Sequence, residues 1–159
     1  MSELKIKNRD WAVVLDGRKA LLLQNNGDEL YPDLVVREVR DHVDQPNHEL
    51  HTDRPGKVHQ SAASSHSAVE QTDRHDAAER AFVEQVSARL AELVSADKDC
   101  RIVVVAPPRA LGMIRKAYSP AVRAALSAEL DHDWIHLPVH DIESRLIGLS
   151  RPKARGDAA

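Results

Sequence analysis

Several residue types and patterns are scarce in this chain, and each scarcity limits what the protein can be. The single cysteine, Cys100, has no disulfide partner within the chain, and its place before a very apolar segment indicates a buried structural thiol. No apolar stretch reaches the roughly 18 residues that a membrane-spanning helix needs, so we expect no membrane contact. Neither Gly-x-Gly-x-x-Gly nor a Walker pattern occurs, which argues against a nucleotide cofactor.

The charge balance and the first residues favour a cytoplasmic location. A formal net charge of -3 gives the whole protein no electrostatic attraction to nucleic acid or to an anionic membrane. Any contact with RNA must therefore be local. The segment MSELKIKNRDW has charges but no apolar run after them, and we therefore expect neither a secretory signal nor an anchor. A chain of 159 residues with 42% apolar residues predicts one domain with one core.

The order of strand-like and helix-like segments predicts an α/β fold. We expect a single domain over residues 10–149, in which a mixed sheet carries helices on its faces, with an extension over 1–9 and a frayed tail over 150–159. Asp16-Gly17 predicts a hairpin between two apolar strands, and a third strand is expected over 34–39.

The second half of the chain carries helix signals and one strongly apolar strand. A long helix is expected from its cap at Asp73 through Leu93, because apolar residues recur there at helical spacing. The continuous apolar run 101–106 predicts the middle strand of the sheet. Pro108 and Pro138 are placed to open helices, and Ser119-Pro120 repeats the pattern of a capping residue followed by proline. Residues 122–130 predict a short helix or a helix-to-strand transition.

Residues 41–73 differ in character from the rest and predict a long loop, which is where we look for activity. The segment has few large apolar side chains and many Ser, His and Asp residues. Six of the nine histidines lie in or beside it, but their spacing matches no usual zinc motif, and we predict no metal site. The serines lack a nucleophile elbow, so no catalytic residue is assigned.

Cations at two places predict contacts with a phosphate backbone. Arg54, Gly56 and Lys57 form a tight turn in the loop, with Arg74 and His75 at its far end. No aromatic residue lies between positions 32 and 81 to stack on a base, which argues against sequence-specific recognition of single strands there. Arg109 and Arg115, together with Lys116 and Arg123, predict a second basic face on the helix after the apolar strand.

Four segments carry a family resemblance, which spans residues 10–148. They are Trp11-Ala-Val-Val-Leu-Asp-Gly-Arg-Lys-Ala20, Thr52-Asp-Arg-Pro-Gly-Lys-Val58, Val103-Val-Val-Ala-Pro-Pro-Arg109 and Leu137-Pro-Val-His-Asp-Ile-Glu-Ser-Arg-Leu146. In this order and separation they resemble the bacterial host attachment protein family. That family is similar to the middle domain of archaeo-eukaryotic release factors, an RNase H-like α/β domain, and the similarity implies association with the ribosome.

The resemblance does not extend to the catalytic tip of release factors. In those proteins a Gly-Gly-Gln tip, on a long loop ahead of the long helix, enters the peptidyl-transferase centre. The corresponding loop here contains Gly56 and Gln60 but no Gly-Gly-Gln, so neither residue receives a catalytic role.

Three functional hypotheses follow. The leading one is a non-enzymatic accessory factor that binds the ribosome or another RNA-containing partner through residues 52–76 and the basic face from Arg109 to Arg123. The second is a metal-dependent or ester hydrolase, which requires at least three loop His and Asp side chains to converge. The third is an attachment-related protein-interaction factor with an exposed apolar patch. Tyr118 and Trp134 are its only obvious aromatic anchors, but the sequence favours core or sheet positions for both.

Overall fold

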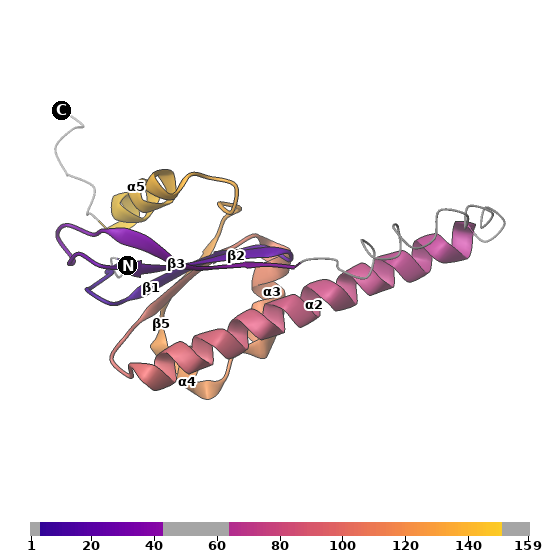
Figure 1. Cartoon of the computed structure of the whole chain (residues 1–159), viewed down its shortest axis with the longest axis horizontal. Coiled ribbons are helices and arrows are strands. Elements are labelled where there is room, and N and C mark those ends of the chain that lie inside the picture. The colour runs from indigo at the N-terminus through magenta and orange to yellow at the C-terminus, as the bar shows by residue number, and fades with distance from the viewer. Residues whose placement is uncertain (1–3, 43–63, 151–159) are drawn as a thin grey trace, which may run out of the picture.

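The computed structural model describes residues 4–42 and 64–150, with side chains placed in 4–42 and 71–149. The described residues form one α/β domain, a five-stranded mixed sheet with four helices (Figure 1). Arg54, Gly56 and Lys57 lie outside the described residues, as do the loop histidines His48, His51 and His59.

The sheet has the strand order β3-β2-β1-β4-β5. β1 and β2 form the predicted antiparallel hairpin, β3 continues it, and β4 and β5 run parallel to β1. The strands are β1 (Trp11–Leu15), β2 (Lys19–Asn25), β3 (Leu34–Asp41), β4 (Ile102–Ala106) and β5 (Leu126–Asp131). The prediction that the run 101–106 is the middle strand was wrong, because β1 holds that place and β4 lies beside it. Both strands are buried throughout, so their composition could not show which of the two lies in the middle of the sheet.

Alternating residues of the inner strands contribute side chains to two hydrophobic clusters, one on each face of the sheet. Val13 and Val104 point into the first cluster, under the helices α2 (Ser64–Ala96), α3 (Pro108–Ala117) and α4 (Pro120–Ala125). The second cluster lies under α5 (Val139–Ser150) and also takes in Leu4 and Ile6, which were predicted to belong to an extension. Burial on both faces explains the continuous apolar sequences of β1 and β4.

Proline and aspartate residues correctly predicted the boundaries of several helices and strands. α3 begins at Pro108 and α4 at Pro120, where the Ser119 hydroxyl accepts a hydrogen bond from the Val122 amide. α4 passes directly into β5, as the predicted helix-to-strand transition requires. Asp16 closes the hairpin by accepting hydrogen bonds from the amides of Arg18 and Lys19, each 2.8 Å long.

The long helix starts ten residues earlier than predicted. α2 begins at Ser64, so Asp73 lies inside the helix instead of capping it, and the predicted loop 41–73 loses its last ten residues. Asp41, the first residue of that loop, is the last residue of β3. The sequence has no Gly or Pro from Lys57 to Ala106, and extending a helix that is already nucleated by packing costs little.

Candidate functional site

The amino-terminal part of α2 projects away from the domain, and we call its residues 64–81 the arm. At 1.5 Å per residue these 18 residues extend about 27 Å. Among the side chains described in α2, the first buried one is Phe82, and the buried stripe continues at Val86, Leu90 and Val94. Residues 71–81 lack this stripe, and Figure 1 shows the arm extending well past the edge of the sheet.

Charged side chains hold the base of the arm against α3. The Arg109 guanidinium donates to the Asp76 carboxylate and, at 3.1 Å, to Oε2 of Glu79. Hydrogen bonding to Asp76 and the nearby charge of Glu79 raise the pKa of Arg109. On its other side Glu79 lies against the hairpin turn, since a Cβ atom built on Gly17 would come within 2.8 Å of its Cδ atom.

A groove of about 470 Å³ runs between the base of the arm and α3. Both signs of charge line it: Asp76 and Glu84 are the acidic residues, and Arg80, Arg109 and Lys116 are the basic ones. The groove lies beside the carboxyl ends of β1 and β4, the edge at which open α/β sheets usually bind their ligands. Arg80 was not predicted from the sequence, although the spacing Asp76, Arg80, Glu84 is the ion-pair spacing of one helix face.

The predicted basic face around α3 divides into two separate groups. Arg109 and Lys116 line the groove, whereas Arg115 points to β5, where its Nε atom lies 3.2 Å from Oε2 of Glu129. The Tyr118 hydroxyl donates to the same carboxylate at 3.0 Å, and burial together with that charge raises the pKa of Tyr118. Carboxylates therefore compensate Arg109 and Arg115, whereas Arg123 donates to the carbonyl group of Arg115 and no described carboxylate pairs with Lys116.

The arm itself exposes a balanced set of charges. Arg74 and His75 are exposed on it, but they lie inside α2 and not at the end of a loop, as was predicted. Between residues 71 and 81 the cations Arg74 and Arg80 stand beside Asp73, Asp76 and Glu79. The arm can thus present individual cations to a partner, but its described part is not a basic surface.

The described part of the chain holds neither a metal-binding group of side chains nor a reactive cysteine. No three His, Cys, Asp or Glu side chains within 4–42 and 71–149 come together in a group that could hold a metal ion. His42 lies against Phe82 with ring centroids 6.2 Å apart. Cys100 is buried, as predicted, and burial raises the pKa of its thiol, which disfavours the reactive thiolate.

An exposed apolar pair lies on the loop between β2 and β3. Leu30 and Tyr31 are 74% and 78% exposed, while Tyr118 and Trp134, the aromatic anchors considered from sequence, are buried in the core. Polar side chains hold this loop rigidly. The buried Asn25 amide donates to three carbonyl groups, of Ile6, Lys7 and Asp28, and the Asp28 carboxylate accepts from the amides of both Leu30 and Tyr31.

Together these features define a class, a mixed-sheet α/β domain with one long projecting helix. Within the described residues no helix is both long enough and apolar enough to cross a membrane. Residues 11–146 match the family described as "Protein required for attachment to host cells", and the chain belongs to that family. No curated protein matches the chain.

Proposed function

We propose that the protein is a non-catalytic accessory factor that binds the ribosome or another RNA-containing partner through the arm. The observation that carries the proposal is the projection of residues 64–81 beyond the packed domain. A helix that buries none of its described side chains ahead of Phe82 gains no stability from the core, and its length is explained if a partner contacts it.

The position of the arm also supports the release-factor similarity. The resemblance implies a long loop directly ahead of a long helix, and α2 directly follows residues 43–63 along the chain. Arg54 and Lys57 fall in that preceding segment, and Arg74 and His75 lie on the arm itself. Candidate cations therefore occur both on the arm and in the segment that precedes it along the chain.

The structure narrows the proposed surface. Arg109 and Arg115 are both paired with carboxylates, so we assign Arg109 the role of holding the base of the arm and leave Arg115 out of the contact. Of the candidate residues on the arm and in the segment ahead of it, Arg54, Lys57 and Arg74 carry a permanent positive charge, and together they can neutralise three phosphates. Such a contact predicts a shallow dependence on salt, with a slope of log K against log salt of about -2 to -3.

Sedimentation of the protein with purified ribosomes over a salt series tests the proposal. We expect pelleting at low salt, and we expect the triple variant Arg54→Ala, Lys57→Ala, Arg74→Ala to lose it. A matched variant, Lys19→Ala, Arg37→Ala, Lys98→Ala, removes three exposed cations that lie outside both residues 52–81 and the face from Arg109 to Arg123, and it should still pellet. Equal pelleting of the two triple variants, or no pelleting of the unaltered protein at low salt, would contradict the proposal.

A second candidate function, a protein-interaction factor in attachment, is favoured by the Leu30 and Tyr31 pair. Interfaces are enriched in aromatic anchors held on rigid elements, and this pair is both exposed and fixed by the hydrogen bonds of Asn25 and Asp28. If the pair is such an anchor, Leu30→Ser with Tyr31→Ser lowers attachment of the bacterium to host cells. The control Val39→Ser alters a side chain that is 50% exposed on β3 and should leave attachment unchanged. Normal attachment by the double variant would exclude this role.

A further inference from the structure

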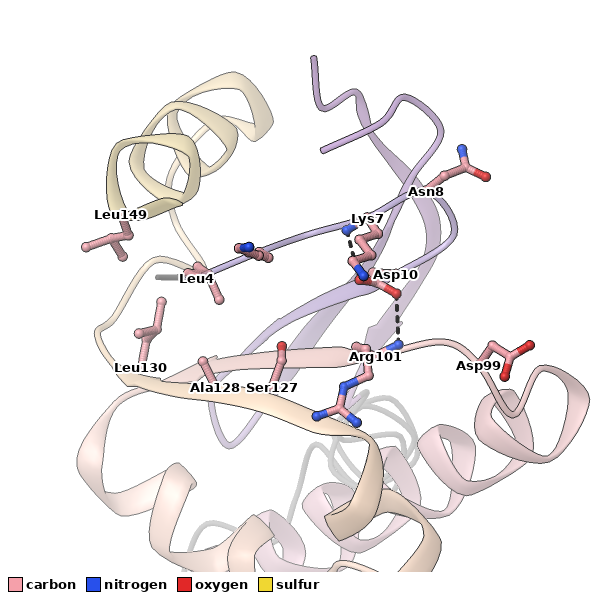
Figure 2. Close-up of a pocket in the computed structure, with 11 residues that line it drawn as sticks. Leu4, Lys7, Asn8, Asp10, Asp99, Arg101, Ser127, Ala128, Leu130 and Leu149 are labelled. Atoms are coloured by element: carbon pink, nitrogen blue, oxygen red, sulfur yellow. Dashed lines mark hydrogen bonds between the residues drawn. The ribbon is translucent and has the colours of Figure 1, made fainter. Parts of the chain in front are cut away.

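The two edge strands of the sheet, β5 and β3, differ in what lies beside them. At β5 the Arg101 guanidinium donates to the carbonyl groups of Ala124 and Leu126, at 3.0 and 3.1 Å. A cavity of about 780 Å³ lies between β5, the segment 4–10 and the end of α5, and Asp10 bonds that segment to the start of β4 (Figure 2). Other parts of the chain therefore flank β5.

The second half of β3, in contrast, has an open edge. The His42 amide donates to the carbonyl group of Arg18, just ahead of β2, at 2.6 Å. Residues of an antiparallel strand point their backbone groups alternately toward and away from the neighbouring strand. The N–H and C=O groups of Val39 and Asp41 therefore point outward. Because β3 is the last strand of the sheet, no strand in the described part of the chain pairs with them.

The first half of β3 has its edge capped by another element. The Leu34 amide donates to Oε2 of Glu143, a residue of α5, at 2.7 Å. A bulge at Arg37 then interrupts the pairing of β3 with β2, and regular pairing resumes at Glu38. The open edge of regular strand therefore runs from Glu38 to His42.

The charges along this open edge alternate in sign. Residues 37–41 read Arg-Glu-Val-Arg-Asp. Edge strands are commonly protected by charged side chains, and like charges that lie opposite one another repel a second strand. Here, however, each cation on one side of Val39 is matched by an anion at the same distance on the other side. An antiparallel second copy of the segment would meet an opposite charge at every charged position.

We infer that β3 pairs with β3 of a second copy of this chain, antiparallel and centred on Val39. Val39 then lies opposite its own copy. Glu38 of each molecule lies opposite Arg40 of the other, and Arg37 lies opposite Asp41 in the same way. The contact is isologous, so each of these charge pairs occurs twice and the assembly closes as a dimer.

The charge pattern selects this register over its neighbours. Centring the pair on Glu38 would place two carboxylates opposite one another, and centring it on Arg40 would do the same with two guanidinium groups. Like charges that lie directly opposite across two strands destabilise the pairing. Only the register centred on Val39 sets an uncharged residue against its own copy within 37–41.

The available side chains predict a weak dimer. Arg37 and Asp41 are exposed, and neither forms an ion pair with another described residue. Val39 is 50% exposed, and its side chain would be covered by that of the second copy. Glu38 already pairs with two arginines of its own chain, so it adds less. For so short an interface we expect a Kd of about 10–100 µM.

Sedimentation velocity of the full chain, from about 5 to 500 µM, tests the pairing. We expect a monomer–dimer equilibrium. Arg37→Asp and Asp41→Arg each set like charges opposite one another twice, and each should weaken the dimer about tenfold. The double variant sets opposite charges together again and should recover the dimer. Lys98→Asp makes the same change of charge outside β3 and is the matched control for Arg37→Asp, with no effect expected.

Two substitutions at Val39 test the backbone contact. Val39→Pro removes the outward N–H group and no hydrogen bond to β2, whereas Val39→Ser removes the same side chain but keeps the amide. We expect the proline to abolish the dimer and the serine to weaken it only slightly. Circular dichroism checks that Val39→Pro folds, and the charge variants decide the outcome if it does not.

Three results would overturn the inference. The first is a monomer at every concentration of the unaltered protein. The second is a dimer that survives both Arg37→Asp and Asp41→Arg. The third is a dimer that only the double variant Leu30→Ser, Tyr31→Ser dissociates, because the contact would then lie on that exposed pair. The pairing of β3 involves neither the arm nor its partner, so it can fail while ribosome binding holds, and the reverse.

Discussion

The two parts of α2 share one helical backbone but differ in what holds them. From Phe82 to Val94 a stripe of buried side chains packs on the sheet, whereas at residues 71–81 no side chain is buried. Ion pairs of Arg109 with Asp76 and Glu79 at the base are the main described attachment of the arm. Exposed pairs of this kind contribute little to stability, so the packed part secures the fold and the arm is left for a partner.

Proline substitution should give the largest difference in stability between the packed part of α2 and the arm. Gln85 and Gln71 are both exposed, one on the packed part and one on the arm. Proline inside a helix costs about 3 kcal/mol or more, so Gln85→Pro should prevent stable folding. Gln71→Pro should break only the arm and leave the thermal midpoint of the domain almost unchanged. Circular dichroism melting of both variants checks this, and equal destabilisation would show that the arm belongs to the cooperative fold.

Removal of one core side chain is the next largest effect. Leu90 is fully buried in the first cluster, and Leu90→Ala should lower the free energy of unfolding by about 2–5 kcal/mol. Ala78→Gly, a change at the base of the arm, should cost at most about 1 kcal/mol, the difference in helix propensity. Urea denaturation measures both, and a loss of similar size for the two would contradict the contrast.

An ion pair on the packed part should give a smaller, pH-dependent effect. Burial opposes ionisation of Glu38, but hydrogen bonds from Arg89 and Arg40 prevail and lower the pKa of Glu38 below its ordinary 4.5. Glu38→Gln should therefore cost about 1 kcal/mol at neutral pH. The stabilisation by ionised Glu38 is fully present above pH 4.5 and is lost as the pH falls through the lowered pKa. Denaturation curves of both proteins should converge in acid; a gap that persists there would refute this account.

The smallest global effect is expected for Arg109→Ala. The substitution releases Asp76 and Glu79 from α3 but removes no buried contact, so the melting temperature should hardly change. Local opening of the helix should become more frequent, and amide hydrogen exchange over residues 74–81 should accelerate severalfold. Lys116→Ala, a change on the same groove without a described ion pair, is the control. A large drop in melting temperature would show that Arg109 supports the whole fold.

Sequence patterns predicted the elements whose signals are local. The hairpin at Asp16-Gly17, the helices that begin at or just after a proline, and the burial of Cys100 each depend on neighbouring residues, and the structure confirms them. The start of α2 was not predicted, because the arm has no apolar periodicity and its helical state shows only in the absence of Gly and Pro.

The candidate site was less predictable, because its charges meet across long distances in the sequence. Arg109 and Arg115 lie close together along the chain and predicted one basic face, but their partners Asp76, Glu79 and Glu129 come from other elements. The cavity near Lys7 and Arg101 joins residues more than 90 positions apart. Arg54, Gly56 and Lys57 remain predictions, since they lie outside the described residues.

The most direct test of the central claim is hydrogen exchange, measured by mass spectrometry, on the free protein and on the protein with ribosomes. In the free protein we expect residues 64–81 to exchange quickly and 82–96 slowly. Ribosomes should slow exchange in 64–81 and leave 82–96 unchanged. Equal protection of both parts in the free protein, or no change in the arm when ribosomes are added, would contradict the claim that the arm is the binding element.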